Sequence, residues 1–337
     1  MTTISCNIPF GVVQHPNFVA FMAKYTNRVV PSRFTLTRSM ESKSPVILSK
    51  IKEEVEGKDI FMALDETTDP LQRSMTAVLI GPLDGHFLGR PYLINLEDVK
   101  KADNETMTNV AVSSIRNVFG SEFQRERLKI FITDGAAYCI KAAENLRDHY
   151  PRMIHVTCLA HGLNRGTWIK AVDYYASHFE IVRDFVNGLE DTKHSIERAK
   201  TVINEESLHN EIKFINQHMD KLRIAIACLE ERLPLLTSAT IVENLLCEIT
   251  IEPFKSKSKE IIEKNTGYIE LRELAEQAQD EGSVHFIFRN APIVNCDAER
   301  VFSMMKTVNT PKRTKLTPQH IKQIMLIRWN SEFGGKA

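Results

Sequence analysis

The chain has 337 residues, of which 43% are apolar and 26% charged, and this composition excludes a globally disordered protein. Its 43 basic and 43 acidic side chains balance, so the overall charge gives no sign of a polyanionic partner and any basic surface has to be local. Six scattered cysteines without a CxxC pair favour a reducing compartment. The sequence predicts neither secretion nor a membrane span, because it has no signal-peptide pattern and no run of about 18 apolar residues.

Residues 1–58 are expected to form a helical, polar N-terminal lead-in. Two helical stretches, HPNFVAFMAKY and SPVILSKIKEEVEG, are separated by VVPSRFTLTR, which has the composition of a loop. After Gly57 the pattern changes to short apolar runs, which are typical of strands.

Residues 59–165 are expected to form the first part of a core with an RNase H-like order of elements. Strands are predicted at 60–64, 75–80 and 86–96, followed by a helix from near Asp103, the strand LKIFIT, the helix AAYCIKAAENLRDHY and the strand MIHVTC. In this topology the first and fourth strands lie side by side and parallel. The predicted fold class is α/β, with a mixed five-stranded RNase H-like sheet, flanking helices and an all-helical insertion.

The insertion is expected to span residues 166–285, which contain few glycines and almost none of the alternation of apolar and polar residues that is typical of strands. Its clearest part is a heptad pattern of apolar residues from Leu208 to Leu233, ending at Pro234, and a long helix packed on its neighbours is favoured there over an intermolecular coiled coil. KSKSKE at 255–260 is interpreted as a solvated linker or turn. Residues 286–337 are expected to hold two helices, with Glu299 at the beginning of the first and TPQ at the start of the second.

Three carboxylates have the placement of a metal site. Asp65 in FMALDETTD and Asp134 in KIFITDGAAY each follow an apolar strand, and Glu299 in NCDAERVFS lies at a helix start. Each has an ordinary structural explanation, because acids cap turns and helix N-termini. The expected adjacency of the two strands favours metal binding by the aspartates. Such acids can hold two divalent cations for phosphodiester chemistry, which points to nucleic acid as the substrate.

Two further motifs are candidates for the neighbourhood of the site or for DNA contacts. Cys158 and His161 form a CxxH pair directly after the last predicted strand, and a packing cysteine with a site-proximal histidine is favoured over a zinc finger, which needs four ligands. The basic side chains of Lys312, Arg313 and Lys315 are candidates for DNA binding, with an ordinary solvated face as the alternative. PKRTK at 311–315 is either a nuclear signal or a basic turn between helices.

DETTD, ITDGAAY, TCLAHGLN and AERVFS with KRTKL after it occur in this order along the chain. Together these blocks resemble those of hAT-superfamily transposases, from about residue 8 to residue 330. The resemblance implies that Asp65, Asp134 and Glu299 match the two catalytic aspartates and the catalytic glutamate of a DDE site, and that Cys158 and His161 match a CxxH element near it. It also implies Mg²⁺ or Mn²⁺ in a two-metal site, DNA as the partner, and homo-oligomers formed through the C-terminal helices.

The family reaction hydrolyses a DNA strand at a transposon end, forms a hairpin on flanking DNA and joins the excised end to target DNA. Two departures limit the resemblance. Family members usually begin with a BED-type zinc finger, which has no counterpart before Ile8, and Trp168 lacks the RWxS-like context usual in their insertion. These departures resemble a truncated or domesticated element. The opening IPFGVVQHPNFVAF is also similar to the CGG triplet-repeat-binding protein group, which consists of nuclear DNA-binding proteins.

The expected function is that of a nuclear, hAT transposase-derived DNA-binding protein with a retained DDE site for metal-dependent strand cleavage and transfer. Two alternatives stay open from the sequence. One is a domesticated, non-catalytic protein that binds DNA or regulates transcription, and the other is a dimerising scaffold.

Overall fold

The computed structural model describes residue 4 and residues 6–86, 89–163, 168–190, 193–278, 282–310 and 316–331, without the side chains of 168–170. Its centre is a five-stranded mixed sheet of order β3-β2-β1-β4-β5. The strands are β1 (Asp59–Thr68), β2 (Ser74–Leu83), β3 (Tyr92–Asp98), β4 (Leu128–Thr133) and β5 (Ile154–Thr157). β2 runs antiparallel to both of its neighbours, β1 and β3, whereas β1, β4 and β5 are parallel to one another. This confirms the predicted α/β class and is consistent with the RNase H-like order.

Both faces of the sheet are buried, which explains the near-continuous apolar runs of its strands. Along β1, Ile60, Met62 and Leu64 pack into one core, whereas Phe61 and Ala63 pack into a second core on the opposite face. The period of two thereby decides on which face every side chain of the strand lies.

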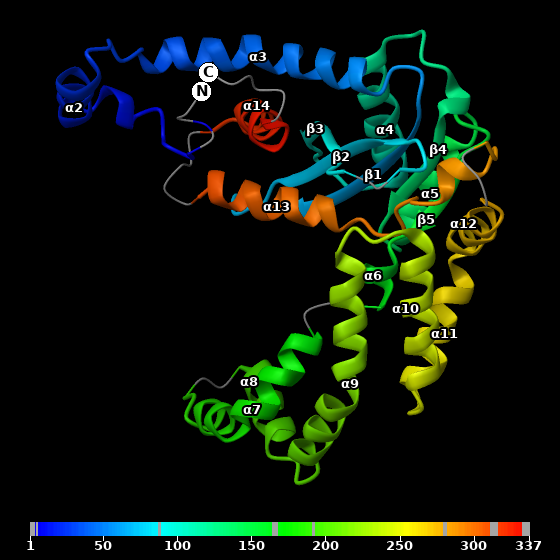
Figure 1. Ribbon diagram of the computed structural model, residues 1–337. Helices are drawn as coiled ribbons and strands as arrows, with labels where there is room; N and C mark the ends of the chain where they lie inside the picture. The colour runs from blue at the N-terminus through cyan, green and yellow to red at the C-terminus, as the bar shows by residue number, and fades with distance from the viewer. Residues whose placement is uncertain are drawn as a thin grey trace.

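Three helices cover the face of Ile60 and Met62, and they are α3 (Arg33–Glu54), α4 (Asn104–Phe119) and α5 (Ala137–Leu146). α4 begins at the predicted position, because the Asp103 side chain accepts a hydrogen bond from the Thr106 backbone N–H at 2.9 Å. α2 (Pro16–Thr26) lies at the far end of α3 and buries none of its residues (Figure 1).

The prediction of a loop at VVPSRFTLTR is wrong for the second part of this segment, which is helical. α3 begins at Arg33, because Ser32 caps it by accepting the Thr35 backbone N–H at 3.1 Å. The helix then continues through Pro45. A proline inside a helix removes one hydrogen bond, but Met40 and Ile47 are buried on either side of it and hold the helix against the core.

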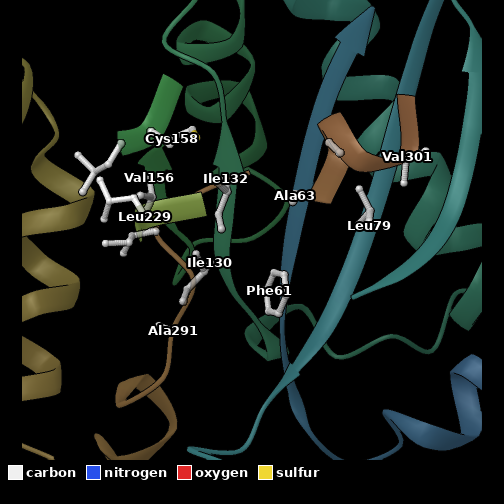
Figure 2. Close-up of a cluster of buried hydrophobic side chains, with 14 of the residues drawn as sticks. Phe61, Ala63, Leu79, Ile130, Ile132, Val156, Cys158, Leu229, Ala291 and Val301 are labelled. Carbon is white, nitrogen blue, oxygen red and sulfur yellow. The ribbon is translucent and has the colours of Figure 1, made fainter. Parts of the chain in front are cut away.

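The opposite face of the sheet packs against α13 (Cys296–Val308) and against helices of the helical region. Figure 2 shows part of this core, where Phe61 and Ala63 of β1 and Ile130 of β4 lie with Leu229 and with Val301 of α13. α14 (Pro318–Trp329) packs against β3 and α3, and its Trp329 indole N–H donates to the Pro91 carbonyl at 2.7 Å. The two predicted C-terminal helices are therefore present and lie within the fold.

The region after β5 is largely helical, as predicted, and its described residues between 168 and 278 form no strand. It consists of α6 (Leu159–Leu163), α7 (Trp168–Asn187), α8 (His194–Ile203), α9 (Leu208–Glu230), α10 (Leu235–Glu248), α11 (Phe254–Lys264) and α12 (Thr266–Glu276). Short 3-10 helices occur at η1 (Val12–Gln14), η2 (Arg125–Arg127) and η3 (Phe286–Phe288). α7, α8 and the far end of α9 extend away from the sheet (Figure 1).

α9 corresponds to the predicted heptad segment and packs on α7 and α10 of the same chain. The expectation of a linker at KSKSKE is wrong, because these residues lie inside α11, where lysine–glutamate pairs such as Lys257 with Glu260 support the helix. The division into segments at residues 58, 165 and 285 stays a prediction. Among the described residues, no helix is both long and apolar enough to cross a membrane.

Candidate metal centre

The sheet topology places the candidate acids near one another. β1 and β4 are adjacent and parallel, and their register pairs Ala63 with Ile132, two residues before Asp65 and Asp134 respectively. Asp65 has the same parity as Phe61 and Ala63, so it faces the core that contains α13. Two segments distant in sequence, α6 and the first turn of α13, add His161 and Glu299 to this end of the sheet.

Asp65, His161 and Glu299 form a group whose ligand atoms all lie within 4.8 Å of one another. Asp65 is buried, with 6% of its surface exposed, whereas His161 and Glu299 are exposed. The group is therefore closed on the side of the sheet and open to solvent on the side of the two helices.

The Asp65 carboxylate has one satisfied and one unsatisfied oxygen. Oδ1 accepts the Glu66 backbone N–H at 2.9 Å, whereas the buried Oδ2 has no hydrogen-bond partner among the described residues. Burial raises the pKa of Asp65 well above its ordinary value, and the negative charges of Glu299 and, more weakly, Asp134 raise it further. A bound cation would satisfy the free oxygen and offset the repulsion between the acids.

Asp134 lies close enough for its charge to act on Asp65, but it is outside the group of three in the part of the chain that the structure describes. Its Oδ1 accepts the Ala136 backbone N–H at 3.1 Å at the start of α5, and its carboxylate also hydrogen-bonds the Cys139 thiol. Asp134 thus stabilises the turn between β4 and α5 and does not cap the helix, whose N-cap is Ala136, while it stays next to Asp65.

Cys158 joins three segments beneath the site. Its backbone N–H donates to the Thr133 carbonyl at 2.8 Å, and its sulfur accepts the backbone N–H groups of Asn295 at 3.1 Å and of His161 at 3.4 Å. A hydrogen bond from Cys296 lowers the pKa of the buried Cys158 thiol, and the backbone N–H groups add to this effect. The cysteine of the CxxH pair therefore fixes the backbone on which His161 is carried.

Asn295 is a positioning residue that the sequence reasoning missed. It occupies the N-cap of α13 but makes no side-chain cap; its amide Nδ2 instead donates to the Leu64 carbonyl at 2.9 Å, next to Asp65. Asn295 thereby ties the helix of Glu299 to the strand of Asp65. An asparagine before a helix is ordinarily interpreted as a cap, so the sequence carried no signal for this contact.

The residues beside Asp65 have structural roles. Glu66 lies on the other face, where the Tyr138 hydroxyl donates to its Oε1 at 2.7 Å. Asp69 is buried and accepts hydrogen bonds from the Arg73 side chain at 2.7 Å and from the Asn309 side chain at 2.8 Å. The candidate DNA-binding residues Lys312, Arg313 and Lys315 lie outside the described residues.

The donor set of the site fits a divalent cation. Carboxylate oxygens suit Mg²⁺ and Mn²⁺, an imidazole nitrogen suits transition-metal ions, and the buried free oxygen of Asp65 lacks any other partner among the described groups. No protein-family model matches the chain, and no curated protein matches it either. The class that fold and site define is an α/β protein with a sheet order consistent with RNase H-like proteins and a candidate metal centre beside the central strand.

Proposed function

We propose that this chain is a hAT transposase-derived, nuclear DNA-binding protein whose site cleaves and transfers DNA strands with Mg²⁺ or Mn²⁺. The observation that carries the proposal is the meeting of Asp65 and Glu299, from distant parts of the sequence, with a buried carboxylate oxygen that has no partner among the described residues. The strand order and the four ordered sequence blocks support it.

In this proposal the protein side chains hold the cations and set their position. Asp65 supplies its free Oδ2 from the rigid central strand, and Glu299 supplies a carboxylate from the first turn of α13. Asp134, beside Asp65, is proposed as the third acid and as a contributor to a second cation. Divalent cations bound there supply the charge that activates an attacking oxygen and stabilises a leaving one.

The partners and the compartment belong to the same proposal. DNA is the proposed partner, the C-terminal helices are the proposed contact between copies of the chain, and the nucleus is the proposed compartment. Most apolar residues of α14 are buried within the chain itself, and Gln319 is its one exposed residue in the described structure, so a contact between copies through α14 would use Gln319 and half-buried side chains.

The test is nicking of supercoiled plasmid DNA in the presence of Mg²⁺ or Mn²⁺. We expect Asp65→Asn to abolish nicking without loss of folding, because the amide keeps the shape of the side chain and removes a buried charge. Asp148→Asn, at an exposed aspartate after α5, is the matched control and should nick as the wild type does. Equal activity of wild type and Asp65→Asn, or no activity in either, would sink the proposal.

A second function is favoured by one observation, the engagement of Asp134 at the start of α5 outside the group of three. It suits a domesticated protein that binds DNA and regulates transcription without cleaving it. DNA affinity that falls steeply with salt, survives Asp134→Asn and is accompanied by no nicking would support this second function. Absence of any DNA affinity would exclude this second function and leave the dimerising scaffold as the remaining alternative.

A further inference from the structure

We infer that His161 is the third ligand of the cation held by Asp65 and Glu299, and that this set of two oxygens and one nitrogen selects a first-row transition-metal ion such as Mn²⁺ over Mg²⁺. The inference deepens the proposed function at the same site and rests on it for the chemistry the ion would perform. Metal binding itself is tested separately.

The distances between the three ligand groups suit one shared ion. Ligand atoms that each lie about 2.1 Å from a common ion are separated from one another by about 3 to 4.2 Å. The ligand atoms of Asp65, His161 and Glu299 all lie within 4.8 Å of one another. Small rotations of the two exposed side chains are therefore enough to bring all three onto one ion, without movement of the backbone.

Asp65 and His161 both have ligand atoms without a hydrogen-bond partner among the described residues. Asp65 Oδ2 is buried without a hydrogen-bond partner among the described residues, which is costly unless a cation or another donor reaches it. No hydrogen bond is assigned to the His161 ring within the described part of the chain, so both ring nitrogens are available. Three residues that belong to different elements thus present free ligand atoms to one point.

Backbone hydrogen bonds hold His161 and its helix α6 in place. The backbone N–H of His161 donates to the buried Cys158 sulfur, and the Leu159 N–H donates to the Ile293 carbonyl at 3.1 Å. The Leu159 bond, together with the bond from the Asn295 N–H to the same sulfur, fixes α6 to the segment that leads into α13. The imidazole and the Glu299 carboxylate are therefore carried by two elements that share a common support.

The identity of the ion follows from the donor atoms. Mg²⁺ takes oxygen ligands and keeps several waters, whereas imidazole nitrogen favours transition-metal ions. Asp134, the oxygen donor that would complete an all-carboxylate set, lies outside the group and is hydrogen-bonded at the start of α5. With His161 in its place, the site gains affinity for Mn²⁺ and related ions and gains little for Mg²⁺.

The experiment titrates the full chain with Mn²⁺, follows the EPR signal of the free ion, and repeats the titration in the presence of Mg²⁺. In the wild type, Mn²⁺ should bind at least about tenfold more tightly than Mg²⁺. His161→Ala should weaken Mn²⁺ binding by about tenfold or more, since loss even of groups that only orient a ligand costs about 10–100-fold. Mg²⁺ binding should change little.

Two further variants make the result specific. His161→Gln offers an amide oxygen in place of the nitrogen, so it should lower the preference for Mn²⁺ over Mg²⁺. His149→Ala, at an exposed histidine after α5, is the control and should bind Mn²⁺ as the wild type does. His161 is exposed, so these variants are expected to fold, and circular dichroism checks this.

The outcomes separate the inference from the proposed function. Unchanged Mn²⁺ affinity and preference in His161→Ala, or no Mn²⁺ binding in the wild type, overturns the inference, even where plasmid nicking is observed. Mn²⁺ binding that depends on His161, in a chain that nicks no DNA in either ion, supports the inference and refutes the catalytic proposal.

Discussion

Two consecutive acids show how a single position along a strand decides the role of a side chain. Asp65 and Glu66 are both carboxylates in β1, but the alternation of the strand sends them to opposite faces of the sheet. Asp65 meets His161 and Glu299, whereas Glu66 accepts a hydrogen bond from Tyr138. A shift of the register by one residue would exchange these roles. The buried side chains of β1 fix its register, and the site depends on this register.

His155 on β5 makes the stability of the fold depend on pH. Burial lowers the pKa of its imidazole from 6.5 to about 4, and the positive charge of Arg147 adds to the shift, while the ring shares a hydrogen bond of 2.9 Å with the Thr133 hydroxyl. Between about pH 6.5 and pH 4, His155 is protonated in the unfolded chain but stays neutral in the folded chain. Stability is therefore lost as the pH falls toward 4, by up to about 3 kcal/mol at 1.36 kcal/mol per pKa unit.

Urea unfolding of the wild type and of His155→Gln between pH 7 and pH 4.5 measures this contribution. The glutamine can keep a hydrogen bond to Thr133 but does not titrate. The free energy of unfolding of His155→Gln should fall less over this range than that of the wild type. The two proteins share every other titrating group, so the difference between them reports His155. Parallel curves would show that His155 is not the group responsible.

At the scale of elements, α12 closes the edge of the sheet by direct contact with β5. The Asn265 side chain accepts the Thr157 N–H at 3.2 Å and donates to the Thr157 carbonyl at 2.6 Å, which satisfies backbone groups of an edge strand. Gly267 in the first turn of α12 comes so close that an added Cβ would lie 1.8 Å from the His155 carbonyl oxygen. The glycine is needed here for close approach of two backbones.

Gly267→Ala is predicted to destabilise the protein although it improves helix propensity. In an exposed helix this change would stabilise by about 1 kcal/mol, whereas a contact of this kind has to be relieved by backbone shifts that cost about 1–3 kcal/mol or more. Urea unfolding should therefore show a net loss. Glu270→Ala, at an exposed position of the same helix, is the control and should change stability little. A gain in stability for Gly267→Ala would mean that α12 does not dock this closely.

Periodicity made most elements predictable from the sequence, and the two helical segments that it missed depend on capping and on charge pairs. The strand runs around Phe61 and Ile130 and the cap at Asp103 carry local signals, so these elements lie where they were expected. The first part of α3 and the helix over KSKSKE have the composition of loops, but a cap at Ser32 starts the one and lysine–glutamate pairs three and four residues apart support the other. Both signals are local, and the composition of the two segments concealed them.

The candidate site was predictable to a lesser degree than the sheet. Strand ends and sequence blocks pointed to Asp65, Asp134 and Glu299, and the structure brings two of these acids together with His161. The position of Asp134 outside the group of three and the bond from Asn295 to Leu64 depend on side-chain directions. Packing in the folded chain sets such side-chain directions, so no sequence pattern predicts them.

At the scale of the whole molecule, the helical region is fastened to the candidate site by one ion-pair network. Arg232, just after α9, forms a two-pronged contact with Asp297, with its Nε 3.0 Å and its Nη2 2.6 Å from the carboxylate oxygens. Arg300 joins Asp297 at 3.0 Å and also donates to the Glu230 carbonyl at 2.6 Å. Asp297 lies in the same helical turn as Glu299, so this contact links the position of the glutamate to the helical region.

A double-mutant cycle with Arg232→Met and Asp297→Asn should measure this link as a coupling free energy of unfolding of about 1–2 kcal/mol, because paired charge-assisted hydrogen bonds in a partly buried site exceed exposed ion pairs. The cycle for Arg223 and Asp220, an exposed pair within α9, is the matched control and should give only about 0.3–0.5 kcal/mol. Equal coupling in both cycles would contradict the prediction.

Arg232→Met should also weaken Mn²⁺ binding without touching a ligand, since α13 loses one of its ties to the end of α9 and keeps only the bond from Arg300 to the Glu230 carbonyl among the contacts of this network. Unchanged Mn²⁺ affinity would show that this bond and the core beneath Val301 are enough to position Glu299.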